Sequence, residues 1–227
     1  MSGAIKGVLF DLDGTLIDTE KLFVRFWQEA AREMGYPMRL EHALMIRGMA
    51  RDKAETLLKE TVCPDFDYHG VRERRTELME AWIDRHGIEL KPGAKELLEA
   101  LRGWGIRIGL ATASNLPRAE RCLKTTGLYP YFDAVTVAAM VPRGKPAPDI
   151  YIEAARRLGV SAEEAVGVED APSGIRAIHA SGLFPVLVPD QDQPEDELAS
   201  LCGLITPSLI DLKNWIEKKK DAERGNW

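Results

Sequence analysis

Apolar residues follow different periods in different parts of this chain. The first apolar run, at 5–10, is short, rich in β-branched and aromatic residues, and ends at Asp11, which predicts a buried strand. Residues 19–89 instead place apolar side chains at helical spacing, with no convincing strand among them. From Lys91 onward, short apolar runs alternate with helical patterns. This alternation is typical of a parallel sheet with helices on both faces.

The alternating region also predicts the order of the elements. If the strand at 5–10 joins the same sheet, the helical block is an insertion after the first strand. We therefore expect an α/β protein, with a Rossmann-like parallel-sheet core formed by 1–18 and 90–227 and an inserted helical domain at 19–89. The charged tail from Lys218 onward is expected to fray. The predicted strands are 107–111, 134–138, 165–168 and 184–188, and the predicted helices are 93–104, 117–127, 148–158, 173–180 and 208–219.

Composition narrows the class of protein. The chain has 227 residues and a formal net charge of −6, so it is a poor binder of a nucleic acid backbone. Three cysteines are widely spaced, without the spacing of a metal site or a disulfide scaffold. No signal peptide and no apolar run of membrane-spanning length stand out. These features favour a soluble cytoplasmic protein without nucleic acid or membrane partners.

Polar side chains follow the predicted strands where each strand ends. Ligands of an open parallel sheet bind outside the carboxyl ends of its strands, so these side chains are expected to meet at one edge. Converging carboxylates repel one another unless a cation joins them, and oxygen ligands suit a hard divalent ion such as Mg²⁺. With a lysine added, the site would hold an anion such as phosphate. The side chains concerned are Asp11, Asp13, Thr15, Thr112, Ser114, Asn115, Lys145, Glu169 and Asp170.

These residues resemble the four motifs of the haloacid dehalogenase (HAD)-like hydrolase superfamily, in the branch of β-phosphoglucomutase-like enzymes and phosphatases with a helical cap. The motifs stand in the family's order and, with the helical insertion, cover most of the chain. They are the segment Asp11-Leu12-Asp13-Gly14-Thr15, then Thr112, Lys145 and the pair Glu169-Asp170. The resemblance implies the HAD fold and Mg²⁺-dependent phosphoryl chemistry.

Asp11 and Asp13 are the candidates for the chemical steps. A carboxylate nucleophile divides the slow hydrolysis of a phosphate monoester into two easier steps through an aspartyl-phosphate, and we assign this role to Asp11. Residues two positions apart in an extended segment point the same way, so Asp13 can protonate the leaving oxygen and then activate water. The resemblance implies that Asp11, Asp170 and the main-chain carbonyl of Asp13 ligate Mg²⁺. Glu169 would touch the metal directly or through another group.

Other residues are assigned to the phosphoryl group and the substrate. The resemblance implies that Thr112 hydrogen-bonds the transferring phosphoryl group and that Lys145 neutralises the nucleophile and the phosphoryl oxygens. Asn115 or Ser114 can equally cap the helix that starts near Pro117. The candidates for substrate binding are Thr15, Ser114, Asn115 and Arg51.

The first motif narrows the reaction. Haloalkanoate dehalogenases of the superfamily lack the acid at the place of Asp13, so phosphoryl chemistry is favoured. Phosphonate-cleaving members use a cap lysine; Lys53 lies in about the right helix, but its surroundings do not resemble that branch. A β-phosphoglucomutase-type mutase is the alternative, because Arg51 falls where mutases and some phosphatases grip a distal phosphate. Mutases carry a cap histidine where this chain has Phe23.

We therefore predict a phosphatase, with the sugar-phosphate mutase as the alternative. A non-catalytic relative is disfavoured because the nucleophile and the metal-binding acids are all present. A helical cap that closes over the site excludes water and favours a small substrate, such as a sugar or polyol phosphate. We expect a monomer or weak dimer, with a small phosphate ester as its partner.

Overall fold

The computed structural model describes residues 4–47, 49, 51–189 and 195–224. The chain divides into two compact units, one formed by Met1–Ile17 with Glu89–Trp227 and the other by Asp18–Ile88. The first unit therefore consists of two chain segments, and the second is inserted between them. Each unit has its own apolar core.

The first unit is built on a six-stranded sheet in the order β3-β2-β1-β4-β5-β6. All neighbouring strands run parallel, so the expected α/β class is confirmed. The first strand lies near the centre and is fully buried, which explains its uninterrupted apolar sequence. The strands are β1 (Gly7–Phe10), β2 (Arg107–Thr112), β3 (Ala134–Val137), β4 (Ala165–Glu169), β5 (Phe184–Leu187) and β6 (Leu204–Ile205).

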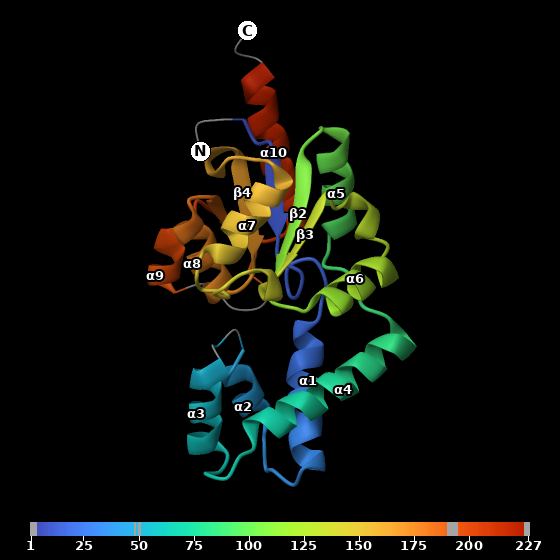
Figure 1. The fold of residues 1–227 in the computed structure, drawn as a ribbon, viewed down its shortest axis with the longest axis vertical. Coiled ribbons are helices and arrows are strands. Elements are labelled where there is room, and N and C mark those ends of the chain that lie inside the picture. The colour runs from blue at the N-terminus through green and yellow to red at the C-terminus, as the bar shows by residue number, and fades with distance from the viewer. Residues whose placement is uncertain (1–3, 48, 50, 190–194, 225–227) are drawn as a thin grey trace. The chain divides into compact units, whose positions relative to one another are not determined.

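Helices cover both faces of this sheet (Figure 1). On one face α7 packs on β1, β2 and β3 and also contacts α8, which lies against β4 and β5. On the other face α5 contacts β2 and packs against α10. The helices are α5 (Ala94–Gly103), α6 (Leu116–Thr125), α7 (Asp149–Leu158), α8 (Pro172–Ser181), α9 (Asp196–Leu201) and α10 (Leu209–Arg224), with short 3-10 turns at Tyr129–Tyr131, Ala138–Met140 and Ala162–Glu164.

The second unit is helical throughout its described residues, as its periodicity predicts. Its core forms where α1 packs on α4 and α2, and Trp27 and Tyr68 meet there with ring centroids 5.4 Å apart. Its helices are α1 (Glu20–Glu33), α2 (Leu40–Met45), α3 (Arg51–Thr61) and α4 (Tyr68–His86).

The structure corrects the sequence reading at the end of the chain. The predictions missed α9 and the two-residue strand β6, which is too short to give a recognisable pattern. The expectation that the chain frays from Lys218 is wrong as far as Arg224, because α10 continues to that residue. Lysine, glutamate, alanine and arginine all have good helix propensity, which accounts for the longer helix.

Candidate active site

The sheet register brings the first and fourth motifs together. Phe10, the last residue of β1, pairs with Leu110 on one side and with Val168 on the other, so Asp11 follows at the level of Glu169. The amide of Asp11 continues the ladder by donating to the carbonyl of Val168 at 3.0 Å. Asp11 therefore emerges beside Glu169, at the carboxyl edge where the sequence placed them.

Lys145 joins the two carboxylates at this edge. Its Nζ donates to Asp11 Oδ1 at 2.5 Å, to Glu169 Oε1 at 2.6 Å and to the carbonyl of Ala111 at 2.9 Å. The side chains of Lys145, Asp11 and Glu169 are 8%, 9% and 2% exposed. A buried charge is tolerated only when it is paired and hydrogen-bonded, and this cluster meets that condition.

The Glu169 carboxylate is saturated with hydrogen bonds. Oε1 accepts from Lys145 and, at 3.0 Å, from the hydroxyl of the buried Tyr151. Oε2 accepts from the amides of Asp170 and Ala171 at 3.2 and 3.3 Å. Gly174 in α8 leaves room for this side chain, because a Cβ there would overlap the Glu169 carboxylate. Glu169 is thus fixed from four directions.

Burial and charge act against each other in this cluster. Burial raises the pKa of Asp11 to about 7, opposed by Lys145 and reinforced by the charges of Glu169 and Asp13. For Lys145, burial acts to lower the pKa, but the carboxylates of Asp11 and Glu169 raise it above its ordinary value. The lysine therefore stays cationic, and its charge favours the ionised form of Asp11.

Three carboxylates at this edge could hold a metal ion. Asp11, Glu169 and Asp170 each offer an oxygen, and these atoms lie within 4.8 Å of one another. Asp170 Oδ1 accepts from the Thr15 hydroxyl at 2.8 Å, and Gly14 is required beside it because a Cβ there would overlap the Asp170 carboxylate. An oxygen-only donor set with a net negative charge is the chemistry that Mg²⁺ prefers.

Asp13 belongs to a second cluster. Arg118 Nη1 donates to Asp13 Oδ2 at 2.7 Å and Nη2 donates to Oδ1 at 2.8 Å, which is a bidentate pair. The Ser114 hydroxyl donates to Oδ2 at 2.9 Å and accepts from Arg118 Nη1 at 2.5 Å. Although burial alone would lower it, the neighbouring Asp13 carboxylate raises the pKa of Arg118 above its usual value.

The remaining candidate residues lie in both units. Thr112 is buried at the end of β2, and its Oγ1 accepts from the Ser114 amide at 3.1 Å. Asn115 is the N-cap of α6, where its Oδ1 accepts from the amide of Arg118 at 2.9 Å. Arg51 begins α3 in the second unit, where it is exposed, and burial together with the Arg51 charge lowers the pKa of Arg72. Of the substrate-binding candidates, Thr15, Ser114 and Asn115 thus lie in the first unit.

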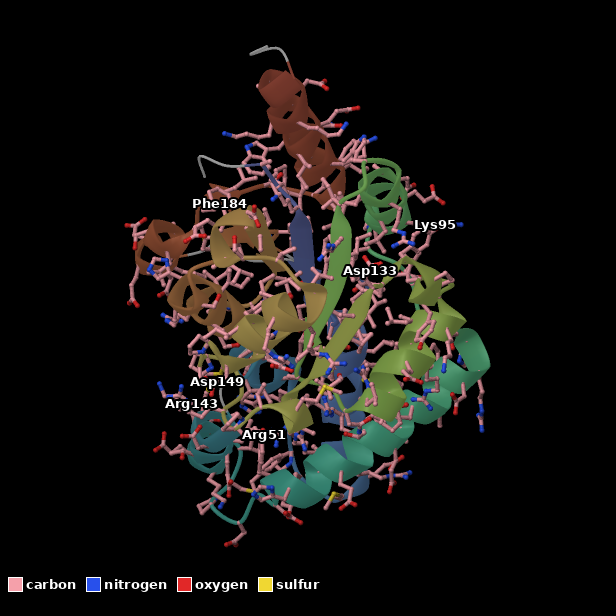
Figure 2. The ribbon with its side chains drawn as sticks, turned by 45° about the horizontal axis from the view of Figure 1, so that its top comes forward. Arg51, Lys95, Asp133, Arg143, Asp149 and Phe184 are labelled. Atoms are coloured by element: carbon pink, nitrogen blue, oxygen red, sulfur yellow. The ribbon has the colours of Figure 1, made fainter. Side chains whose placement is uncertain are left out.

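Sequence reasoning missed Tyr151 and Arg118. Arg118 lies in the first turn of α6, and an arginine there is ordinary in any helix, so the sequence carries no signal for its pairing with Asp13. Tyr151 lies on the inner face of α7, and an aromatic residue there reads simply as core. Figure 2 shows Arg143 and Asp149, which flank the Lys145 loop and form an ion pair of 2.9 Å.

A family model describing haloacid dehalogenase-like hydrolases matches residues 5–182. The chain belongs to this family. Its relatives include the fructose-1-phosphate phosphatase YqaB of Escherichia coli, 31% identical over 182 residues, with 79% of this chain and 94% of the relative covered. Hexitol phosphatase A of E. coli is 36% identical over 184 residues, covering 81% and 82%. The β-phosphoglucomutase of Bacillus subtilis is 32% identical over 196 residues, covering 84% and 85%.

A solved structure shares the fold of this HAD hydrolase. The crystal structure of CbbY from Rhodobacter sphaeroides in complex with phosphate superposes with a TM-score of 0.75 at 28% identity, covering 92% of this chain and 96% of that one. The family resemblance and the predicted enzyme class, a phosphatase, are confirmed by these relatives. Among the described residues, no helix is long and apolar enough to cross a membrane.

Proposed function

We propose that this HAD hydrolase is a Mg²⁺-dependent phosphatase that releases phosphate from a small phosphorylated metabolite, a sugar or polyol phosphate, through an aspartyl-phosphate on Asp11. The observation that carries the proposal is the Lys145 cluster. It holds one carboxylate, that of Asp11, at the edge of the sheet beside a saturated partner, that of Glu169. A nucleophile held in place by a buried cation, which favours its ionised form, is prepared for attack on phosphorus.

The first step transfers the phosphoryl group to the enzyme. An oxygen of Asp11 attacks phosphorus, and the bond from phosphorus to the substrate oxygen breaks. Asp13 gives a proton to that leaving oxygen, which becomes a hydroxyl of the alcohol product. Lys145 and the hydroxyl of Thr112 stabilise the charge on the phosphoryl oxygens.

The second step releases phosphate. A water molecule attacks the phosphorus of the aspartyl-phosphate and gives its proton to Asp13. The bond between phosphorus and the Asp11 oxygen then breaks, which restores the carboxylate of Asp11 and leaves Asp13 protonated for the next cycle. Two carboxylates two residues apart therefore supply the nucleophile and the acid–base group of the whole cycle.

Mg²⁺ would be held by Asp11 and Asp170, with the main-chain carbonyl of Asp13. When bound, it neutralises charge on the phosphoryl group and the nucleophile. We infer that Glu169 acts through Lys145 and does not ligate the metal itself, because both of its oxygens already accept two hydrogen bonds. Thr15 would orient the metal-binding carboxylate of Asp170.

The assignment of substrate class rests on the relatives and the inserted unit. Relatives of this chain are named as phosphatases of fructose 1-phosphate and of hexitols. We propose that 19–89 is a cap domain that selects the substrate, with Arg51 as a contact for a second polar or anionic group. In the core, the Ser114 hydroxyl donates to Asp13 and Asn115 caps the helix that carries Arg118, so we propose both as contacts for the leaving group.

A sugar-phosphate mutase is the second candidate. It is favoured by the 32% identity to the β-phosphoglucomutase of B. subtilis over 84% of this chain. Phe23 weighs against it, since it stands where the resemblance places a mutase histidine. A mutase returns the phosphoryl group to sugar, whereas a phosphatase passes it to water, so the two products separate the candidates.

The test is a panel of hexose, hexitol and pentose phosphates incubated with the protein and Mg²⁺, with released phosphate and rearranged sugar phosphate both measured. We expect free phosphate from at least one sugar or polyol phosphate, and loss of at least about a thousandfold in Asp11→Asn. Rearranged sugar phosphate without free phosphate, in the presence of a bisphosphate primer, would establish the mutase instead. Equal activity of the wild type and Asp11→Asn rejects both.

A further inference from the structure

Arg118 binds the carboxylate of Asp13, which the proposed mechanism needs as acid and base. Its guanidinium takes one oxygen of Asp13 with each terminal nitrogen, at 2.7 and 2.8 Å, while the Ser114 hydroxyl takes Oδ2 as well. The Arg118 and Asp13 side chains are 13% and 17% exposed, so solvent screens this pair only weakly. Helix α6 fixes the arginine, because its own amide is the donor to the Asn115 cap.

This arrangement is unsuited to either proton transfer. A general acid needs a carboxyl O–H directed at the leaving oxygen, and a general base needs a carboxylate lone pair directed at water. Both oxygens of Asp13 instead accept strong, charge-assisted hydrogen bonds from one planar guanidinium. The contacts therefore describe a resting arrangement, which has to open before Asp13 can act.

We propose that Arg118 is a positioning residue that holds the Asp13 carboxylate in a resting arrangement, from which the hydroxyl-bearing part of a polyol or sugar phosphate releases it. Substrate hydroxyls can accept from the guanidinium and donate to the carboxylate, so they replace both sides of the pair. The inference rests on the proposed function and adds to it a coupling of proton transfer to the presence of the polyol part. A phosphoryl donor without hydroxyls leaves Asp13 held.

Acetyl phosphate isolates this coupling. Asp11 attacks its phosphorus, and acetate leaves with the bonding electron pair without needing a proton. Hydrolysis of the aspartyl-phosphate still requires Asp13 to take a proton from the attacking water, now with no polyol present. With a hexitol phosphate, the proposal has the alcohol product still in the site when water attacks, so turnover reports the released carboxylate. The turnover of acetyl phosphate reports the held one.

The variant Arg118→Met keeps most of the side-chain length and removes the guanidinium. We expect it to raise kcat for acetyl phosphate about tenfold, the scale on which a charge-assisted pair affects a rate. For a hexitol phosphate, whose hydroxyls would accept from the guanidinium, we expect KM to rise and kcat to gain less than it does for acetyl phosphate. Arg118→Lys, which keeps the charge but not the bidentate geometry, should fall between. A fall in both rates by the same factor shows a structural role only, and a larger fall with the hexitol phosphate shows that Arg118 assists the productive state. Either result overturns the proposal.

A measurement without turnover guards against variants that fold poorly. Nitrogen-15 NMR of arginine side chains should show a slowly exchanging guanidinium in Asp11→Asn, which binds but cannot be phosphorylated, and the signal should be missing from the Asp13→Asn, Asp11→Asn double variant. Saturation with a hexitol phosphate should shift this signal and speed its exchange, because hydroxyls replace the carboxylate as the partner of the guanidinium. An unchanged signal at saturation contradicts the proposal. If the wild type releases no phosphate from any sugar or polyol phosphate, the proposed function fails, and the acetyl phosphate comparison alone then decides the role of Arg118.

Discussion

Asp11 and Asp13 stand two residues apart, yet they are held by two different kinds of cation contact. The nucleophile Asp11 shares the compact ammonium of Lys145 with Glu169, deep in the sheet edge. The acid–base candidate Asp13 accepts a bidentate pair of hydrogen bonds from Arg118 on α6 and a further hydrogen bond from Ser114. Lys145 thus pairs with two buried carboxylates, whereas Arg118 binds both oxygens of one carboxylate.

This difference fits the two tasks. A nucleophile gains from a fixed position and a fixed charge, which a lysine tied to Asp11, Glu169 and a main-chain carbonyl provides. An acid–base group has to exchange a proton twice in each cycle, so its partner has to let go. The contact of Lys145 with Asp11 and Glu169 is therefore expected to affect both stability and catalysis. The contact of Arg118 with Asp13 is expected to affect catalysis, with a smaller effect on stability.

Removal of Lys145 tests the first half of this comparison and has the largest expected effect. Lys145→Met should lower kcat by at least about a thousandfold. Without metal and with EDTA present, it should also lower the free energy of unfolding by about 3–5 kcal/mol at pH 8, because the buried carboxyls of Asp11 and Glu169 lose the cation that compensates them. Urea unfolding measures the second effect.

The same variant gives a pH dependence with a definite sign. Without the lysine, the folded-state pKa of Asp11 rises further above its unfolded value, so the folded protein takes up protons as the pH falls. The penalty should therefore be larger at pH 8 than at pH 5. Arg143→Met is the matched control, since it removes an exposed cation of the same loop and should leave stability and its pH dependence as in the wild type. A penalty for Lys145→Met that is independent of pH contradicts the electrostatic cause.

Asp13→Asn tests the second half. The amide cannot accept from both nitrogens of Arg118 and cannot transfer a proton, so kcat for a hexitol phosphate should fall by about 10²–10⁴. The free energy of unfolding should fall by only about 1–3 kcal/mol, the cost of breaking one charged hydrogen-bonded pair. Steady-state kinetics and urea unfolding measure the two effects. If Asp13→Asn destabilises the fold as strongly as Lys145→Met, the contacts of Lys145 and Arg118 do not differ in their effect on stability, which contradicts the prediction.

Tyr151→Phe removes one hydrogen bond from Glu169 and leaves the ring in place. The buried Glu169 Oε1 then keeps Lys145 but loses the phenol, which should cost about 1–2 kcal/mol of unfolding free energy. Because the lysine shared with Asp11 shifts only slightly, kcat should fall by less than about tenfold with KM unchanged. Thermal unfolding and kinetics at saturating substrate measure this. A change in KM alone would place Tyr151 at the substrate.

The sheet and the acidic edge could be predicted because their signals are local. The apolar run before Asp11 ends abruptly at the first motif. The parallel register of β1 and β4 then brings Asp11 beside Glu169. Arg118 and Tyr151 could not be assigned, because an arginine on a helix and an aromatic on an apolar face are ordinary in any protein. Their meaning comes from tertiary distances of 2.7 and 3.0 Å, which no sequence pattern specifies.

Asn115 separates a helix cap from a substrate contact, and its expected effect is the smallest. Its Oδ1 accepts from the Arg118 amide, so Asn115→Ala should cost about 1 kcal/mol of unfolding free energy through the lost N-cap. Asn115→Ser, which can cap the helix, should recover most of this. If the cap is the whole role, KM for a hexitol phosphate stays at the wild-type value in both variants. A rise in KM in both variants, with stability recovered in the serine variant, would instead show that the asparagine touches the substrate. Since the cap also sets the first turn of the helix that carries Arg118, a small rise in acetyl phosphate turnover in the alanine variant alone would link the cap to the hold on Asp13.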